Sequence, residues 1–330
     1  MAERDGVVAG RPELGGGAAT PSFRLPPGAR PGIPGSAAPL SVGSRVFRWG
    51  ERTYVMGILN VTPDSFSGDG LLHDGRDAPT AARDLAVAMA AEGADILDVG
   101  GESSRPGHAE VTPDEELNRV VPVVAAVRAA LPDMPISVDT IKPAVAAAAL
   151  NAGASMINDV WGVAEDDALA RVAADRGVPI VLMHNRAEAR YTNVMPEIVA
   201  DLERAIERAL AAGVPWESIL VDPGFGFGKT PEHNLVLLRE LETIRLLGRP
   251  ILLGTSRKST LGRVLDLPPD QRVEATVATT VLGIRAGVDI VRVHDVRANV
   301  RAARMTDAIV RSAAPTVPAA TVTDPEGGRS

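Results

Sequence analysis

Cysteine is missing from this 330-residue chain. Its absence excludes disulfides, thiolate metal sites and cysteine nucleophiles. The chain also lacks any run of about 18 apolar residues, so no membrane-spanning segment is predicted. Its N-terminus has no basic stretch followed by an apolar one, which argues against a secretory signal. From these absences we expect a cytoplasmic protein without a membrane partner.

Two residue types are so scarce that their positions are informative. The lysines and phenylalanines are Lys142, Lys229, Lys258, Phe23, Phe47, Phe66, Phe225 and Phe227. Acidic residues outnumber basic ones by 42 to 34, which gives a net charge of −8. This balance argues against a nucleic-acid partner, although a local cluster of basic residues can still hold a small anion.

The distribution of apolar segments indicates one large domain. Residues 1–40 and 314–330 are dense in small residues and proline and lack a hydrophobic period, so we expect disordered extensions there. Between them, the domain at 41–313 holds apolar runs of strand length that alternate with alanine-rich stretches of helical period. The eight runs are 53–60, 94–100, 135–140, 155–160, 178–184, 218–224, 250–256 and 288–295.

Eight β/α units over about 260 residues predict an α/β fold, a single (β/α)8 TIM barrel. A doubly wound open sheet is the alternative, but the even spacing of the units favours a closed barrel. Helix-period stretches such as 79–93 and 196–213 end in glycine, a usual helix stop. The segment 45–57, RVFRWGERTYVMG, predicts a short N-terminal hairpin that plugs the N-terminal end of the barrel.

Each apolar run ends in a polar side chain. In a barrel these ends converge on the C-terminal face, where the active sites of this fold lie. Helix caps and turns would explain any one of these residues, but they explain all eight less well. The residues are Asn60, Asp98, Asp139, Asn158, His184, Asp222, Ser256 and His294.

The stretch DPGFGFGKT (222–230) ends like a phosphate-binding P-loop. Pro223 stands where that motif requires glycine, and it removes an N–H that phosphate would use. A P-loop nucleotide hydrolase is therefore disfavoured. What remains is Asp222 followed by a glycine loop with two aromatic rings. A ring can stack on a flat heterocycle while the carboxylate accepts hydrogen bonds from its edge.

The other loops suggest a metal, an anion and a polar pocket. Asn60 offers a neutral oxygen suited to Mg²⁺, and Phe66 follows in a loop whose composition is typical of a lid. Arg105 can grip an anion, and Arg292 and His294 share one face of the last strand. A diphosphate clamp explains these three residues better than a buried structural pair does.

Carboxylates, an amide and a lysine at adjacent strand ends predict a pocket for a heterocycle rich in N–H donors. These residues are Asp139, Asn158, Asp222 and Lys258. A carboxylate beside the heterocycle would also favour developing positive charge there. His184 has two interpretations at this stage, a ligand-binding group or a buried histidine with its hydrogen bonds satisfied.

Taken together, these motifs resemble those of the dihydropteroate synthases, a pterin-binding TIM-barrel family. They occur in the family's order, and they are NVTPDSFS, DVGGESSRPG, SVDT, NDV, DPGFGFGK, GTSRK and RVHD. The resemblance implies a transferase of folate biosynthesis that uses Mg²⁺. Its substrates would be 6-hydroxymethyl-7,8-dihydropterin diphosphate and p-aminobenzoate, and its products 7,8-dihydropteroate and pyrophosphate. Bacterial members of the family are usually homodimers and are the sulfonamide target.

The resemblance also assigns roles to matching positions. The pterin would contact Asp139, Asn158, Asp222 and Lys258. The diphosphate would contact Asn60, Ser104, Arg105, Arg292 and His294, with Asn60 near the metal. The p-aminobenzoate would contact Phe66, Pro106, Phe227, Ser256 and Lys258. The residues expected to act in catalysis are Asp139, Lys258, Arg292 and His294.

Small departures from the family pattern concern the loops. SGDG follows Phe66 where SDGG is more common, Ser104 replaces a threonine, and HNR follows Met183. Two alternatives remain open at this point. One is a catalytically silent paralogue that binds pterin, and the other is a tetrahydrofolate-dependent methyltransferase domain. The second would lack the Phe66 loop, the Ser-Arg-Pro loop and the RVHD motif.

Overall fold

A computed structural model describes residues 37–61, 77–102, 111–162 and 167–311. Its centre is a sheet of eight parallel strands in the order β8-β7-β6-β5-β4-β3-β10-β9. A parallel bridge between Val221 and Ile251 joins the two edges and closes the barrel. The strands are β3 (Tyr54–Asn60), β4 (Ile96–Gly100), β5 (Ile136–Asp139), β6 (Met156–Asp159), β7 (Ile180–Met183), β8 (Ile219–Asp222), β9 (Leu252–Leu253) and β10 (Ile290–Val293). The predicted TIM barrel is confirmed, strand by strand.

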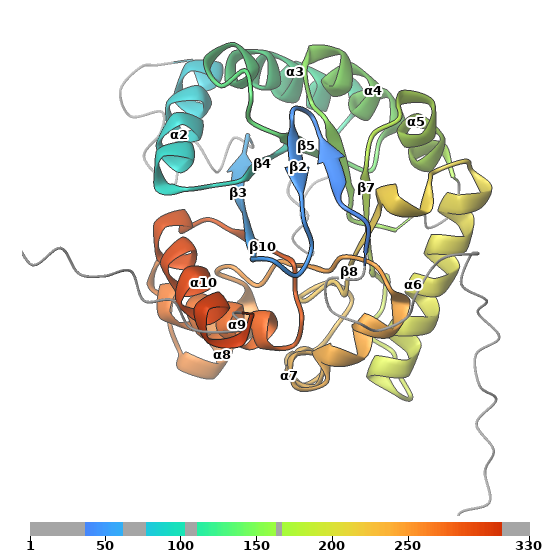
Figure 1. The fold of residues 1–330 in the computed structure, drawn as a ribbon, viewed down its shortest axis with the longest axis vertical. Helices are drawn as coiled ribbons and strands as arrows, with labels where there is room; N and C mark the ends of the chain where they lie inside the picture. The colour runs from blue at the N-terminus through green and yellow to red at the C-terminus, as the bar shows by residue number, and fades with distance from the viewer. Residues whose placement is uncertain (1–36, 62–76, 103–110, 163–166, 312–330) are drawn as a thin grey trace, which may run out of the picture.

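Helices form a ring around the barrel (Figure 1). They are α2 (Ala78–Glu92), α3 (Pro113–Ala130), α4 (Pro143–Ala152), α5 (Ala168–Arg176), α6 (Val194–Ala211), α7 (Pro231–Arg239), α8 (Ser259–Leu265), α9 (Val273–Arg285) and α10 (Val296–Val310), with short 3-10 turns η1 (Trp216–Ser218), η2 (Leu241–Leu247) and η3 (Pro269–Gln271). In α2, local sequence determines where the helix begins and ends. Its cap Asp77 accepts from the backbone N–H of Thr80, and left-handed Gly93 ends it.

The N-terminal hairpin lies earlier in the chain than the sequence predicted. It pairs β1 (Leu40–Val42) with β2 (Arg45–Phe47) in antiparallel register. The expected second strand is β3, which instead pairs in parallel with β4 and β10. Every residue of β3 before Asn60 is buried, as expected for a parallel strand that is covered on both faces. This segment therefore serves as a strand of the barrel and not as half of a hairpin.

The hairpin closes the N-terminal end of the barrel, as predicted, and crosses its centre in Figure 1. Three rings from this region pack on one another, with Phe47 and Tyr54 centroids 4.6 Å apart and Trp49 and Tyr54 centroids 5.8 Å apart. They bury a layer of inward-facing strand residues, namely Met56, Ile96, Met156, Val181, Leu220, Leu252 and Ile290. Apolar packing therefore fills this end and leaves the other for polar groups.

The expected extensions, 1–40 and 314–330, lie outside the described residues apart from 37–40. Within the part of the chain that is described, no helix combines the length and apolarity that a membrane crossing requires.

Candidate active site

The C-terminal ends of neighbouring strands bring the predicted pocket residues together. Asp139 on β5 and Asn158 on β6 are register partners, and Asp222 ends β8. All three side chains are buried or nearly so, with exposed fractions of 9%, 3% and 4% for the residues in that order. Because buried polar groups must be partnered, their contacts show how the site is held before a ligand arrives.

Arg292 of β10 forms the centre of this group. Its Nε donates to Oδ2 of Asp98 at 2.5 Å, and its Nη2 donates to Oδ2 of Asp139 at 2.7 Å. The same Asp98 oxygen accepts from Nδ2 of Asn158 at 3.0 Å. One guanidinium thus links three strands, and it lies among the residues predicted to hold the pterin.

The sequence placed Asp98 at the C-terminal face but indicated no contact for it. It belongs to β4, its residue is fully buried, and it orients both Arg292 and Asn158. A signal was available, since a carboxylate in the middle of the apolar run ILDVG is costly to bury without a partner. The run did not show which partner would reach it.

Burial affects the pKa of four charged groups of this site, namely Asp139, Asp222, Lys258 and Arg292. Burial raises the pKa of Asp139 to about 7 despite the nearby Arg292, and it also raises the pKa of Asp222. Burial lowers the pKa of Lys258 to about 7, with Asp222 opposing the shift. For Arg292, burial disfavours the charge, but the carboxylates of Asp98 and Asp139 raise its pKa. Such perturbed groups concentrate at functional sites.

Lys258 lies against the glycine loop, which we define as residues 223–229. Its Nζ donates to the carbonyl oxygen of Phe225 and lies 4.3 Å from the centroid of the Phe227 ring. Phe225 is fully buried, whereas Phe227 is partly exposed. Of the two aromatics in the loop, Phe227 is therefore the one that presents a face beside Lys258.

Ser256 and His294 form a second contact at the mouth. The Ser256 hydroxyl lies 3.0 Å from Nδ1 of His294 and accepts from the backbone N–H of His294 at 3.1 Å. Between Ser256 and Lys258, Arg257 adopts a left-handed φ of 57° and pairs with both carboxylate oxygens of Asp295. This pair fixes the GTSRK turn against the end of β10.

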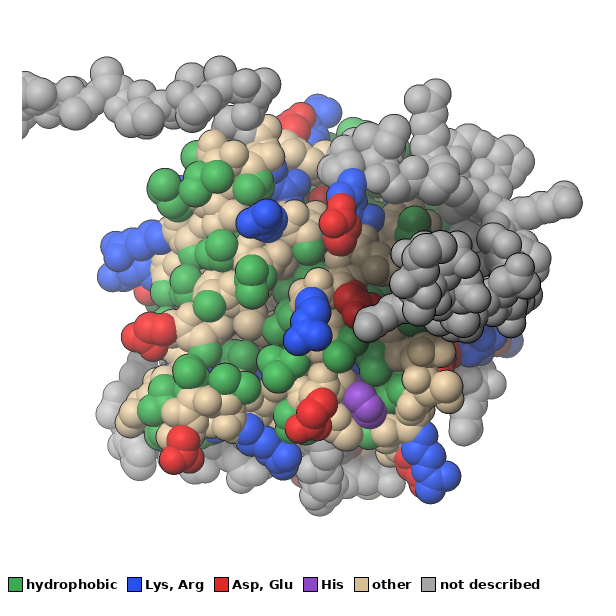
Figure 2. Space-filling view, turned by 90° about the horizontal axis from the view of Figure 1, so that it is seen from below, with side chains coloured by type: hydrophobic (Ala, Val, Ile, Leu, Met, Phe, Trp, Pro, Cys, Tyr) green, Lys and Arg blue, Asp and Glu red, His purple; other side chains and the backbone are tan. Residues whose placement is uncertain are grey.

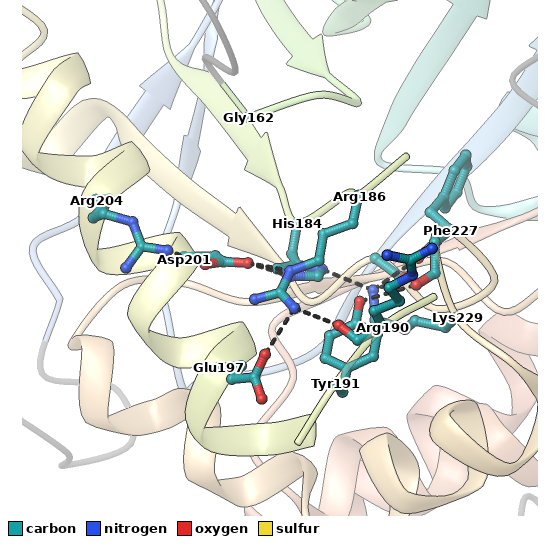
Figure 3. A network of polar contacts seen from close by, with 12 residues as sticks. Gly162, His184, Arg186, Arg190, Tyr191, Glu197, Asp201, Arg204, Phe227 and Lys229 are labelled. Atoms are coloured by element: carbon teal, nitrogen blue, oxygen red, sulfur yellow. Dashed lines mark hydrogen bonds and ion pairs between the residues drawn. The ribbon is translucent and has the colours of Figure 1, made fainter. Parts of the chain in front are cut away.

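His184 is hydrogen-bonded at both ring nitrogens (Figure 3). Its Nε2 lies 3.0 Å from Oδ2 of Asp201 and its Nδ1 lies 2.8 Å from Nζ of Lys229. Burial lowers the pKa of His184 to about 4. Of the two interpretations given above, this arrangement matches that of a buried histidine with its hydrogen bonds satisfied.

Four of the predicted contacts belong to the first two loops. Phe66, Ser104, Arg105 and Pro106 lie outside the described residues. Asn60 ends β3 at the mouth and is partly exposed. Across 37–61, 77–102, 111–162 and 167–311, no group of three His, Cys, Asp or Glu side chains could hold a metal by itself. Mg²⁺ sites commonly use one or two carboxylates beside water and substrate phosphates, whereas Asn60 offers a neutral amide oxygen.

Comparison with known families agrees with this architecture. The family model described as pterin binding enzyme matches residues 56–294, which extends from β3 past the end of β10. The fold and its polar mouth thus define a pterin-binding barrel. The dihydropteroate synthase of Clostridium beijerinckii is 52% identical over 277 residues, covering 82% of this chain and all of the relative. That of Bacillus subtilis is 52% identical over 260 residues, covering 79% of this chain and 90% of the relative.

Solved structures give the same result. A dihydropteroate synthase from Clostridium difficile, determined in the presence of pteroic acid, aligns with a TM-score of 0.76 at 51% identity over 81% of this chain and 100% of its own. The Xanthomonas albilineans enzyme with 4-aminobenzoic acid aligns with a TM-score of 0.77 at 42% identity over 83% of this chain and 98% of its own. The chain belongs to the dihydropteroate synthase family of pterin-binding enzymes.

Proposed function

We propose that this chain transfers the pterin-methyl group of 6-hydroxymethyl-7,8-dihydropterin diphosphate to p-aminobenzoate, giving 7,8-dihydropteroate and pyrophosphate in folate biosynthesis. The observation that carries the proposal is the buried group of Asp139, Asn158 and Asp222 around Arg292 at the mouth of the barrel. The family relationship supports the same reaction.

The pterin site is formed by Asp139, Asn158, Asp222 and Lys258 in this proposal. Carboxylate oxygens accept hydrogen bonds from the N–H edge of the heterocycle. Asp98 positions the Asn158 amide through the hydrogen bond at 3.0 Å, so the pocket is organised before binding. Preorganised groups need little rearrangement when charge develops in the reaction, which is why such sites accelerate it.

The diphosphate side is assigned to Asn60, Ser104, Arg105, Arg292 and His294. Breaking the bond to diphosphate leaves positive charge on the pterin-methyl group and negative charge on the leaving group. Asp139 would favour the cation, and Arg292 and His294 would favour the anion, in an SN1-like substitution. Mg²⁺ bound at Asn60 would neutralise diphosphate charge. When the leaving group is present, Arg292 can exchange one carboxylate partner for a phosphate oxygen.

We assign the second substrate to Phe66, Pro106, Phe227, Ser256 and Lys258. The Phe227 ring and the Lys258 ammonium offer an apolar face and a cation, which suit an aromatic ring bearing a carboxylate. Loops that carry Phe66 and Pro106 would exclude water, which competes with the weak arylamine nucleophile.

We also propose a homodimer that works in the cytoplasm. Large apolar side chains on α7, α8 and α9 are between about one-third and two-thirds exposed, namely Leu235 43%, Val264 59%, Leu265 47%, Val281 37% and Leu282 54%. The face seen from the α7 side shows apolar side chains gathered between charged ones (Figure 2). Apolar surface of this kind marks contact sites between protein chains.

The predicted boundaries, with a folded domain at 41–313, are part of the same proposal.

One assay tests the reaction. The full chain is incubated with the pterin diphosphate, p-aminobenzoate and Mg²⁺, and dihydropteroate is quantified with and without a chelator. Product that depends on both substrates and on Mg²⁺ supports the proposal. Pterin that binds without product formation would instead identify a silent paralogue, and sedimentation of the same sample tests the dimer.

A further inference from the structure

Lys229, at the end of the glycine loop, makes contacts that none of the proposed substrate roles uses. Its Nζ donates to the carbonyl oxygens of Gly224 at 2.9 Å and Phe227 at 3.0 Å, and it lies 2.8 Å from Nδ1 of His184. A protonated lysine has three N–H donors, so these acceptors satisfy it completely. Two acceptors, the carbonyl oxygens of Gly224 and Phe227, belong to the loop, and the third belongs to His184, which follows β7. Lys229 therefore stabilises the loop internally and also links it to the segment after β7 (Figure 3).

The contact of His184 Nε2 with Asp201 determines the role of Nδ1 in its contact with Lys229. A neutral imidazole has one donor and one acceptor nitrogen. Because burial lowers the pKa of His184 to about 4, the ring is neutral near pH 7. Nε2 donates to Asp201 on α6, and Nδ1 is left to accept from Lys229. Asp201 is itself held by Nε of Arg186 at 2.8 Å, so the hydrogen bonds run continuously from α6 to the loop.

The backbone of the loop lies unusually close to the segment after β7. At Gly224, with φ of +69°, an added Cβ would lie 1.8 Å from the carbonyl oxygen of His184. At Gly228, with φ of +53°, it would lie 2.3 Å from that of Arg186. Only glycine fits both positions, yet glycine gives up the most conformational freedom on folding. The bonds from Lys229 offset that loss at the centre of the loop.

We propose that Lys229, oriented by His184 and Asp201, is a positioning residue that holds the glycine loop in the conformation that presents Phe227 to the p-aminobenzoate site. The proposal rests on the proposed function, which places that substrate beside Phe227 and Lys258. Asp222 ends β8, so the sheet sets the position of its backbone, although the N–H of Gly224 in the loop donates to its Oδ1 at 2.7 Å. The backbone of Phe227, by contrast, belongs wholly to the loop. Loss of the Lys229 contacts should therefore disturb the second substrate's site more than the pterin site.

The central test is Lys229→Met, which keeps an unbranched side chain one heavy atom shorter and removes all three donors. Burial lowers the pKa of Lys229 to about 7, so the assay is run below that pH, where the protonated amine predominates. Under these conditions we expect the KM for p-aminobenzoate to rise about tenfold, as for the loss of buried hydrogen bonds. The Kd of the pterin diphosphate should change by less than about threefold. The matched control is Arg204→Ala, which removes the exposed partner of Asp201 and should leave both constants unchanged.

His184 supplies a graded second test. His184→Asn retains an acceptor near the position of Nδ1, whereas His184→Leu has none. The asparagine variant should therefore keep a KM for p-aminobenzoate nearer to that of the wild type. If His184 had only a structural role, both variants would lose thermal stability while their KM values stayed alike.

The chain also permits chemical rescue. Because it contains no cysteine, Lys229→Cys creates a single thiol, and alkylation with 2-bromoethylamine in denaturant followed by refolding rebuilds an amine at this one position. The unmodified variant should have the raised KM and the alkylated one a KM within about threefold of the wild type. Failure of a refolded, alkylated sample to recover would count against the proposal.

A readout without substrates separates this proposal from the proposed function. Amide hydrogen exchange in the glycine loop should accelerate in Lys229→Met, since the N–H groups of Gly226 and Phe227 are hydrogen-bonded in the loop as it stands. Unchanged loop exchange, or a Kd for the pterin diphosphate that worsens as much as the KM, would overturn the positioning role. A wild-type chain that makes no dihydropteroate would overturn the proposed function alone.

Discussion

The two ends of the barrel are built on the same strands and bury opposite kinds of side chain. At the N-terminal end, Met56 and Ile290 pack under the rings of Phe47 and Tyr54. At the C-terminal end, two positions further along β10 from Ile290, Arg292 sits between two carboxylates. Residues two apart on a strand share a face, so Ile290 and Arg292 are successive inward-facing residues of β10. The interior of the barrel therefore changes from apolar to ionic between these two residues.

This contrast separates what stabilises the fold from what the site needs. Apolar burial at the hairpin end gains free energy in proportion to the area removed from water. Charges buried at the mouth cost free energy unless they are paired, and even paired groups contribute little net stability. Substitutions at the hairpin end should therefore change unfolding alone. Those at the mouth should change catalysis and, where they leave a buried charge unpaired, unfolding as well.

The largest effect is expected for Arg292→Ala at the mouth. It removes the proposed diphosphate contact and leaves Asp98 and Asp139 without their cation, so kcat/KM should fall about a thousandfold. Steady-state kinetics and calorimetric binding of the pterin with and without its diphosphate measure this. The loss should be much greater for the diphosphate than for the free pterin. Equal losses for the two ligands would mean that the clamp is wrongly assigned.

The corresponding substitution at the other end is Phe47→Ala. Removing a fully buried ring should lower the free energy of unfolding by about 3–5 kcal/mol. Urea denaturation measures that change. In the folded fraction kcat and both KM values should match the wild type, and a change in either KM would show that the hairpin influences the mouth.

A third prediction concerns acid and the His184 network. The pKa of His184 in the folded chain, about 4, lies below its ordinary value of 6.5, so the unfolded chain binds the proton more readily. Stability from this group is therefore lost as pH falls from 6.5 towards 4, by about 3 kcal/mol in total. Asp201, Lys229 and Arg186 also face the ring, so the informative quantity is the difference between wild type and His184→Asn across that window. Parallel stability curves would contradict the prediction.

The smallest effect is expected for Phe227→Leu. It keeps an apolar side chain but removes the ring face that lies 4.3 Å from Lys258 Nζ. Such contacts are worth about 1 kcal/mol, so the KM for p-aminobenzoate should rise about fivefold while pterin binding is unchanged. A weaker pterin Kd would place the ring in the first substrate's site instead.

Sequence patterns predicted the barrel because both of its signals are local. Apolar runs and the polar residues that end them are visible within a few positions, and closure places those ends together. The partners of Asp98 are not local, since Asn158 and Arg292 lie 60 and 194 residues away. The role of Lys229 depends likewise on His184, 45 residues earlier. No spacing rule within one strand or loop indicates which side chains meet across a barrel.

The barrel closes between β8 and its shortest strand, β9. Strand β9 has two residues, and the edge between β8 and β9 is joined by the Val221–Ile251 bridge and the hydrogen bond from the Val221 N–H to the Pro250 carbonyl oxygen. This seam separates the strand that ends in Asp222 from the one that leads to Ser256. Any movement of β8 relative to β9 would change the distance between Asp222, which is proposed to bind the pterin, and Ser256, which is proposed to contact p-aminobenzoate. The width of this edge of the sheet would therefore set the separation of the two reactants.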